Sequence, residues 1–254
     1  MEEISLILLG LIIGSFLNVV VFRLPLEKSI VAPRSYCPHC KTSIKFYDNI
    51  PVLSFIFLKG KCRSCKNKIS IQYPMIEILT AFSFWFTFKT FGHSALYTGF
   101  TIVFICLLIA LALIDLKHMI LPNELTLGGG LVFLVFSFFN PEITYWDAFA
   151  SAFGSALIFA GLYFFYLKVR KIEGLGFGDV KMMILLGAFL GLKKLVIAVL
   201  ISSLSGLLVG ILIIIFKKKN LRLKLPFGTF LGFGSYVSIF WGEEILKILH
   251  SLYR

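Results

Sequence analysis

The sequence predicts an all-α polytopic membrane protein, with about eight transmembrane helices in one bundle and a cytoplasmic loop held together by zinc. Three observations lead to this fold. The 254 residues are 58% hydrophobic, with a mean hydropathy of +0.92, whereas soluble domains are about 45–50% apolar. Continuous apolar runs long enough to cross a ~30 Å hydrocarbon core recur along the chain, and their continuity argues against a β-barrel. Two Cys-x-x-Cys pairs lie in the longest polar segment.

The apolar runs divide the chain into three parts. Residues 1–22 form a first transmembrane helix, residues 23–72 a polar loop with four of the five cysteines, and residues 73–254 a core of seven further helices. The start of the chain lacks the basic region of a cleavable signal peptide, so we expect the first span to be retained. The predicted spans lie at residues 4–22, 74–91, 97–116, 125–139, 148–167, 180–192, 195–216 and 227–249.

The sixth span, residues 180–192, is short and decides the topology. At 1.5 Å per residue it covers only ~20 Å, so a re-entrant hairpin arm is an alternative to a full crossing. With eight crossings, one side of the membrane carries 20 Lys and Arg residues and the other carries 5. Because short loops rich in Lys and Arg stay in the cytoplasm, this asymmetry favours eight crossings, with both termini outside and the cysteine loop cytoplasmic. The net charge of +12 is explained by these basic loops, so it does not indicate that the protein binds nucleic acid.

The polar loop contains a predicted metal site. Cys37-Pro38-His39-Cys40 and Cys62-Arg63-Ser64-Cys65 are two Cys-x-x-Cys pairs with 21 residues between them. Two such pairs present four thiolates to one tetrahedral ion, and Zn²⁺ fits this ligand set best. We expect a structural site, because Cys37, Cys40, Cys62 and Cys65 leave no open coordination position. Local disulfides or free thiols are the alternative, although disulfides are disfavoured in a cytoplasmic loop.

Two aspartates lie inside or beside apolar segments. Asp115 ends the third predicted span, and Asp179 follows a glycine-rich run at the start of the sixth. Ionisable residues at membrane depth are functional candidates, and the predicted topology puts both at the cytoplasmic ends of their spans. Two carboxylates in one site can share a proton and act as base and acid toward water and a peptide bond. The alternative is that each aspartate reaches water or pairs with Lys117 or Lys181.

Other titratable residues give weaker signals. Asp48 and Asp147 lie in a loop and at a span end, where we expect solvation. Glu77 differs from them because it falls within the second apolar segment. The four histidines form no His-Glu-x-x-His metal motif, and no Ser/His/Asp set is evident.

The run Gly176-Phe177-Gly178-Asp179 matches the G-x-G-D signature of intramembrane aspartyl proteases. Together with its other motifs, the chain closely resembles the bacterial type IV prepilin peptidases, the leader peptidases of pilus and type II secretion systems. The resemblance extends over nearly the whole chain. Its motifs are, in order, Gly14-Ser15-Phe16-Leu17-Asn18-Val19-Val20, Arg23-Leu24-Pro25, the cysteine pairs enclosing Asn49-Ile50-Pro51-Val52-Leu53-Ser54, Ile69-Ser70, Tyr73-Pro74, Glu77, Asp115, Ile120-Leu121-Pro122-Asn123, Gly178-Asp179-Val180-Lys181 and Leu225-Pro226-Phe227-Gly228. Two departures are mild: Phe177 stands where the family often has glycine, and Thr229 where it often has proline.

This resemblance implies an activity. It implies that Asp115 and Asp179 are the catalytic pair, supported by Gly176, Gly178 and Lys181 of the motif, in a peptidase core of residues 73–254. The implied reaction removes a short basic leader from type IV prepilins or pseudopilins after a glycine. It takes place at the cytoplasmic face of the bacterial inner membrane.

The resemblance also implies a second activity. Members of this family commonly methylate the new N-terminal residue, usually phenylalanine, with S-adenosylmethionine as methyl donor. The cytoplasmic loop is tied to that activity, so its presence favours a bifunctional enzyme. The glycine motif of soluble methyltransferases is absent, and the polar candidates near the loop are Asn18, Arg23, Asn49 and Glu77.

Two other functions are compatible with the residues alone. A proton-coupled transporter could use the two aspartates as a relay, although its site would lie near the midplane of the bilayer. A zinc-stabilised membrane scaffold would carry out no chemistry. The sequence does not predict the oligomeric state.

Overall fold

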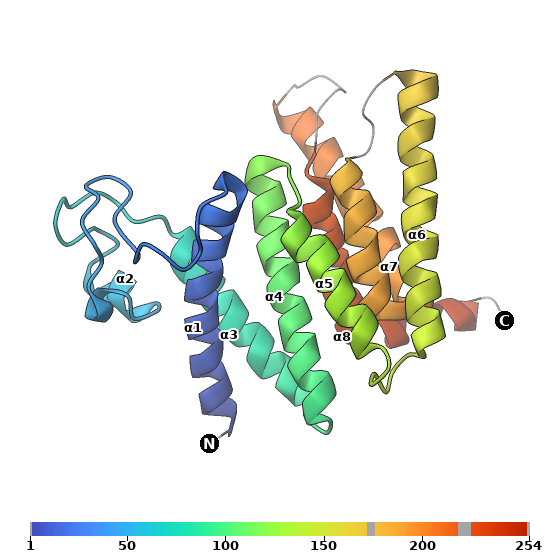
Figure 1. Ribbon diagram of the computed structural model, residues 1–254, viewed down its shortest axis with the longest axis horizontal. Coiled ribbons are helices and arrows are strands. Elements are labelled where there is room, and N and C mark those ends of the chain that lie inside the picture. Colours follow the sequence, from blue (N-terminus) through green and yellow to red (C-terminus); the bar gives the residue numbers. More distant parts are fainter. Residues whose placement is uncertain (1, 172–175, 218–224, 253–254) are drawn as a thin grey trace. The chain divides into compact units, whose positions relative to one another are not determined.

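A computed structural model describes residues 2–171, 176–217 and 225–252 (Figure 1). In these residues the chain is helical, as predicted, and its only β-structure is two isolated bridges. The α-helices are α1 (Glu2–Arg23), α2 (Leu53–Phe57), α3 (Gln72–Phe91), α4 (Ala95–His118), α5 (Asn123–Phe136), α6 (Tyr145–Phe165), α7 (Phe177–Lys217) and α8 (Phe227–Leu252). Shorter helical turns are η1 (Leu24–Leu26), η2 (Phe46–Asp48) and η3 (Tyr166–Arg170). Residues 172–175 and 218–224, parts of the predicted glycine-rich and basic links, lie outside the described residues.

The chain forms two compact units, Met1–Cys106 and Leu107–Arg254. In the first unit, α1 and α3 pack closely through small residues. A Cβ atom added at Gly10 would lie 2.6 Å from the Cα of Ala81, and one at Gly14 would lie 2.7 Å from the Cα of Glu77. The four-residue spacing of the two glycines puts both on one face of α1, which is the small-residue pattern of closely packed membrane helices.

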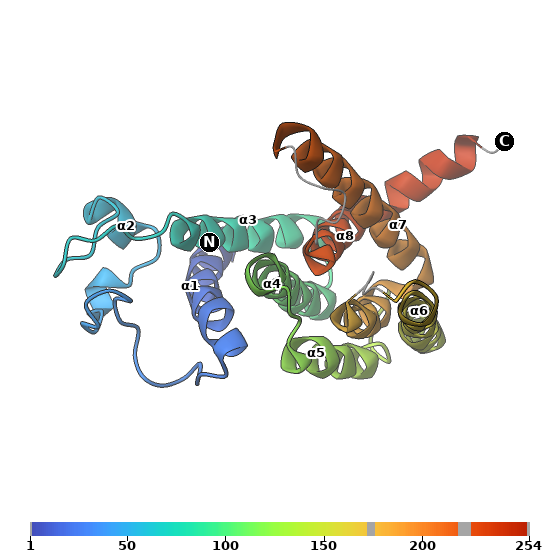
Figure 2. The ribbon, with the colours of Figure 1, turned by 90° about the horizontal axis from the view of Figure 1, so that it is seen from above.

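In the second unit, α7 packs against α5, α6 and α8 (Figures 1 and 2). The contact between α5 and α7 includes an aromatic cluster. The ring of Phe189 lies 5.0 Å from that of Phe133 and 6.3 Å from that of Phe136, measured between centroids, and all three residues are buried. These contacts fix the first half of α7, which carries Asp179, against α5.

The predicted boundary between the sixth and seventh spans lies within α7. The sequence predicts two helices with a link at residues 193–194, and the structure has two helical halves that meet at a kink at Gly191, two residues earlier. Gly191 has φ 67° and ψ 174°, a backbone region that is essentially restricted to glycine. The two halves of α7 therefore run in different directions (Figure 2).

Asp147 of α6 stabilises this kink. Its Oδ1 accepts the backbone N–H of Leu192 (3.2 Å) and the hydroxyl of Ser151 (3.1 Å). The carboxylate thus caps the second half of α7, where an N–H group would otherwise lack a partner. The expectation that Asp147 is simply solvated is wrong.

We expect Gly191→Ala to lower the melting temperature of the purified protein in detergent. Alanine at this φ is strained by about 1–3 kcal/mol, and its Cβ would lie 2.9 Å from the side chain of Ile143. The matched control is Gly154→Ala in α6, where an added Cβ meets no atom within 4 Å. If both variants melt at the wild-type temperature, the kink does not depend on glycine.

Four helical segments of the described residues could cross a membrane, judged by length and composition: Glu2–Leu26, Ala95–His118, Tyr145–Val169 and Phe177–Phe216. The apolar α5 is shorter, at 14 residues. The last of the four segments has 40 residues and would extend about 60 Å if it were straight, twice the ~30 Å hydrocarbon core. Its kink at Gly191 is compatible with two crossings, but the count of eight crossings stays a prediction.

Candidate active site

Asp115 lies in the last turn of α4, against the start of α8. Its Oδ2 accepts the backbone N–H of Thr229 (2.8 Å) and lies 3.3 Å from the Thr229 hydroxyl, which also reaches the carbonyl of Ala112 (2.9 Å). A Cβ added at Gly228 would lie 3.0 Å from the same oxygen. Thr229, one of the two departures from the family pattern, therefore supplies an N–H donor to Asp115 that a proline would lack.

Asp179 is the third residue of α7 and caps the start of that helix. Its Oδ2 accepts the N–H of Gly176 (3.1 Å), and its own N–H donates to the Gly176 carbonyl (3.0 Å). This is half of a capping box: the acidic side chain at the third helical position accepts the N–H of the residue before the helix, while the N–H of Asp179 bonds a backbone carbonyl. Gly178 packs on Leu121, where an added Cβ would lie only 3.1 Å from the Leu121 Cβ.

The structure brings Asp115 and Asp179 together in the second unit. Gly178 and Gly228, which lie close to the two aspartates, both pack against Leu121. The two carboxylates are close enough to interact electrostatically, and each aspartate is only 5% exposed. Two buried carboxylates that interact in this way can share one proton, so that one side chain accepts a proton from water while the other donates one.

Neither Lys117 nor Lys181 neutralises the two carboxylates. In the described part of the chain, neither aspartate forms an ion pair with a Lys, Arg or His side chain. Lys181 instead donates to the Oδ1 of Asn123 (2.7 Å) and lies 5.4 Å from the centre of the Phe177 ring. Lys117 is exposed. The alternative that lysines pair with the aspartates is therefore wrong for this structure.

The four loop cysteines form one cluster in the first unit. Their Sγ atoms all lie within 4.8 Å of one another, so the cluster could hold a metal ion. The Sγ atoms of Cys37 and Cys65 are 3.9 Å apart, and those of Cys40 and Cys62 are 4.0 Å apart. Disulfide bonds require about 2.05 Å between sulfurs, so the four thiols are free.

The two cysteine pairs have the same local fold. After each pair, the next residue (Lys41 or Lys66) has positive φ and donates its N–H to the carbonyl of the first cysteine. The N–H of that first cysteine then bonds the carbonyl of Thr42 or Asn67. Each pair is therefore a tight turn that points two sulfurs the same way, which is how a Cys-x-x-Cys sequence supplies half of a tetrahedral site.

Local hydrogen bonds prepare the thiols unequally for metal binding. Bonds from Thr42 lower the pKa of Cys40 to about 6, and the backbone N–H of Cys65 lowers the pKa of Cys62. A backbone hydrogen bond from Asn67 lowers the pKa of Cys65, but burial and the neighbouring sulfurs outweigh it and raise this pKa to about 11. Because the thiolate is the metal-binding form, the ease of deprotonating these thiols is part of the affinity of the site.

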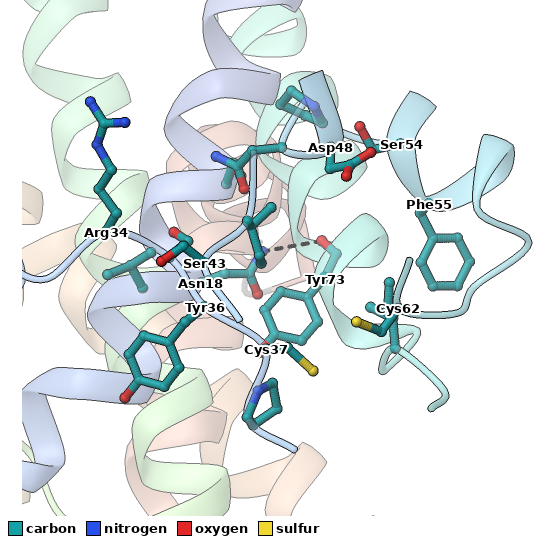
Figure 3. A pocket seen from close by; sticks show the side chains of 18 of the residues that line it. Asn18, Arg34, Tyr36, Cys37, Ser43, Asp48, Ser54, Phe55, Cys62 and Tyr73 are labelled. Carbon is teal, nitrogen blue, oxygen red and sulfur yellow. Dashed lines mark hydrogen bonds between the residues drawn. The ribbon is translucent and has the colours of Figure 1, made fainter. Parts of the chain in front are cut away.

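A pocket of about 850 Å³ lies between the cysteine loop, α1 and α3 (Figure 3). This size is within the ~300–1,000 Å³ of small-molecule and cofactor sites. The four polar candidates named from the sequence, Asn18, Arg23, Asn49 and Glu77, all line it. The structure therefore brings together in one pocket four residues that are spread over nearly 60 positions of the sequence.

Two of these candidates hold the loop in place, and Asn18 joins α1 to α3. The Asn18 amide donates to the carbonyl of Tyr73 (3.2 Å). The Arg23 guanidinium donates to the carbonyls of Ser29 (3.0 Å) and Pro33 (2.8 Å). Glu77 accepts the N–H of Val52 (2.7 Å) through its Oε2.

Sequence reasoning missed one ion pair of the loop. Asp48 is not simply solvated, because Arg63 binds both of its carboxylate oxygens, with a shortest contact of 2.6 Å. The hydrogen bonds from Arg63 hold the pKa of Asp48 below its usual value. Because Arg63 lies between the two cysteines of the second pair, this ion pair ties that turn to η2.

Comparisons with known proteins cover nearly the whole chain. Residues 8–91 match the Bacterial Peptidase A24 N-terminal domain, and residues 102–211 match the Type IV leader peptidase family. Relatives named prepilin leader peptidase/N-methyltransferase include a protein of Aeromonas hydrophila, 35% identical over 94% of this chain and 91% of the relative. A Pseudomonas aeruginosa relative of the same name is 33% identical over 95% of this chain and 91% of the relative. A Myxococcus xanthus relative of the same name is 40% identical over 84% of this chain and 63% of the relative.

No solved structure gives a match to the chain. The resemblance inferred from the ordered motifs is confirmed by the two family matches and by relatives of at least 33% identity. The chain belongs to the type IV leader peptidase family of aspartic peptidases.

Proposed function

We propose that this protein removes the short basic leader from type IV prepilins or pseudopilins, after a glycine, and N-methylates the new N-terminal residue. The observation that carries the peptidase activity is the pair of buried aspartates, which lie in one unit and pair with neither Lys117 nor Lys181. The relatives that are named for both activities cover nearly all of the chain. The cysteine loop, which the resemblance ties to methylation, is present.

Asp115 and Asp179 would hydrolyse the peptide bond without a covalent intermediate. One carboxylate takes a proton from water, the resulting hydroxide attacks the scissile carbonyl carbon, and the other carboxyl group donates its proton to the carbonyl oxygen. The tetrahedral intermediate collapses as the carbon–nitrogen bond breaks and the leaving amine takes up a proton. Thr229 and Gly176 orient the two carboxyl groups through their N–H groups, which reduces the reorganisation that the reaction requires.

Methylation requires a site for S-adenosylmethionine, and the residues of the 850 Å³ pocket fit that molecule. The pocket contains a buried carboxylate, amides and aromatic rings, together with the basic side chains of Arg23, Arg34, Lys45, Arg63 and Lys68. The carboxylate and the rings are the groups that suit a cationic, adenine-containing ligand. Asn18, Asn49 and Glu77 are the residues that would hold it, and Arg23 would fix the wall formed by residues 29–34. When bound, S-adenosylmethionine supplies a methyl group to the new N-terminal amine, which loses a proton to solvent, and S-adenosylhomocysteine is left.

Zn²⁺ is the ion that we assign to the four cysteines. Four Zn–S bonds of about 2.3 Å in a tetrahedron put the sulfurs roughly 3.8 Å apart. The distances of 3.9 Å and 4.0 Å between Sγ atoms support this assignment. With four protein ligands, the ion would have no position for water or substrate, so its role would be to stabilise a loop that has little core of its own.

We place the protein in the bacterial inner membrane with eight crossings, both termini outside and the cysteine loop in the cytoplasm. Single-cysteine labelling tests this topology. Pro141→Cys, in the exposed link between α5 and α6, should react with a membrane-impermeant maleimide that is added outside intact spheroplasts. Reaction only after the membrane is opened would place this link in the cytoplasm and overturn the eight-span arrangement.

The test of the proposed function uses the purified full-length protein. It is incubated with a type IV prepilin and S-adenosylmethionine, and the mass of the pilin is followed. We expect loss of the leader, followed by gain of one methyl group at the new N-terminus. An intact prepilin would reject the peptidase and leave the proton relay or the scaffold as explanations. Cleavage without methylation would reject only the second activity.

A further inference from the structure

The short helix α2 of the cysteine loop has two different faces. Ser54 is buried and Phe55 lines the pocket, whereas Leu53, Ile56 and Phe57 are 51%, 62% and 81% exposed. Because residues three and four positions apart lie on the same side of a helix, these three side chains form one apolar surface, the outer face of α2. Exposed apolar surfaces of this kind mark sites that bind a protein or a membrane.

The charge of the loop indicates the chemistry of the partner. Residues 23–72 contain ten Lys and Arg and two acidic residues, and Arg63 already pairs with one of the acids, Asp48. Lys59 and Lys61 follow α2 closely, are exposed, and form no ion pair within the described residues. An apolar face flanked by lysines suits an anionic lipid surface. The basic leader of a prepilin has the same sign of charge as the loop, so charge does not favour it as the partner.

The contacts of the loop with α1 and α3 bring this face to the level of a bilayer. The N–H of Val52, the residue before α2, donates to Oε2 of Glu77 (2.7 Å), and a Cβ added at Gly14 would lie 2.7 Å from the Cα of Glu77. The start of α2 is therefore near the level of Gly14, which lies nine residues before Arg23, or about 13 Å along the helix axis. Figures 1 and 2 both show the loop beside α1. Since Glu2–Leu26 could cross a membrane, the loop lies alongside a membrane-spanning helix and not beyond its end.

We propose that the outer face of α2 binds the anionic lipid surface of the membrane that α1 crosses, so that the cysteine loop lies on the membrane. Leu53, Ile56 and Phe57 enter the region between the lipid headgroups and the acyl chains, while Lys59 and Lys61 reach the phosphates. In the proposed topology, this surface belongs to the cytoplasmic leaflet. The three apolar residues lie outside the pocket, and the proposal does not rest on either proposed activity.

This placement also accounts for the exposed apolar residues that α1 contributes to the pocket. Ile12 and Phe16 line the pocket, and both are exposed. With the loop on the membrane, the lipid-facing side of α1 forms one wall of the pocket. A substrate that is held in the bilayer can then reach the pocket without leaving the membrane.

A depth measurement on the full-length protein tests this proposal. The protein is placed in nanodiscs of phosphatidylcholine and phosphatidylglycerol whose acyl chains carry bromine, which quenches tryptophan fluorescence on contact. Phe57→Trp adds a fluorophore to the outer face of α2, and the signal of the wild type, from Trp85, Trp146 and Trp241, is subtracted. We expect the bromine to remove most of the added fluorescence, compared with nanodiscs that lack bromine.

Lys28→Trp is the matched control. Lys28 is exposed in the same loop and lies outside the pocket, but its N–H bonds the carbonyl of Arg23 (3.1 Å), which holds it at the end of α1. This variant should keep most of its added fluorescence. Both variants should melt at the wild-type temperature in detergent, because both replaced side chains are exposed. If bromine quenches Phe57→Trp no more than Lys28→Trp, the proposal is wrong.

Two further changes test the role of lipid charge. Replacing phosphatidylglycerol by phosphatidylcholine should reduce the quenching of Phe57→Trp, and so should adding Lys59→Gln and Lys61→Gln to this variant. Unchanged quenching after either change would reject an anionic surface as the partner. Protection of the added tryptophan from acrylamide, without quenching by bromine, would mean that protein such as a second copy of the chain covers α2, and this result would also overturn the proposal.

Discussion

Asp115→Asn and Asp179→Asn each abolish removal of the prepilin leader, with kcat/KM lower by about 10²–10⁴-fold, the contribution of one positioned acid or base. Asparagine has nearly the same shape as aspartate, so it retains an acceptor oxygen for Thr229 or Gly176 but can neither take a proton from water nor donate one as an acid. The measurement is the initial rate of leader loss by mass spectrometry, with the purified variant in detergent.

Both single variants should be equally inactive. In a two-carboxylate mechanism the acid and the base act in the same step, so loss of either carboxylate stops the reaction. The double variant should therefore be no slower than either single variant, because effects of residues that act as a unit are not additive. Glu124→Gln is the matched control, since Glu124 is exposed in the same unit; it should cleave at the wild-type rate. Cleavage at the wild-type rate by either aspartate variant would remove that residue from the mechanism.

The same variants separate chemistry from folding. We place methylation in the pocket of the first unit, so methylation of a pilin peptide that already lacks its leader should not require the aspartate pair of the second unit. We therefore expect Asp115→Asn to methylate such a peptide at the wild-type rate. Loss of both activities would indicate that the substitution unfolds the protein, and the loss of cleavage would then not identify a catalytic group.

Hydropathy predicted most of the helices because a span must satisfy its backbone hydrogen bonds internally. The predicted second and third spans start at residues 74 and 97, close to the observed starts at Gln72 and Ala95. Hydropathy predicted a break in α7 at the lysines of residues 193–194, but not the exact position of the kink at Gly191. It depends on Asp147, which lies on another helix, and hydropathy contains no signal for a side chain that caps a distant backbone.

The site could be predicted in part. Asp115 and Asp179 were identifiable as charges in apolar segments and from the G-x-G-D run. Thr229, which orients Asp115 from 114 positions away, was identifiable only as a departure from the family pattern. Asp48 was wrongly expected to be solvated, because the turn that presents Arg63 to it forms only when the loop folds. Contacts between segments distant in sequence were the part that sequence patterns missed.

We expect Cys37→Ser and Cys62→Ser each to lower the zinc content almost completely, from one ion per chain toward none. Serine is a poor ligand at neutral pH, and three sulfurs leave the tetrahedral site open to water. Structural zinc contributes about 10–16 kcal/mol to the folding of small zinc domains, so the loop should lose its order together with the ion. Zinc is measured by elemental analysis of the purified protein, and loss of order by proteolysis within residues 30–70.

The matched control is Cys106→Ser, which removes a thiol of α4 that lies outside the cluster and should keep its zinc. Unchanged zinc in Cys37→Ser would mean that these thiols are not ligands. Because Cys37 and Cys62 also line the pocket, loss of zinc should abolish binding of S-adenosylmethionine. Asp115 and Asp179 belong to the other compact unit, so cleavage should persist. A cysteine variant that cleaves but neither binds the methyl donor nor methylates would assign the two activities to separate units of the chain.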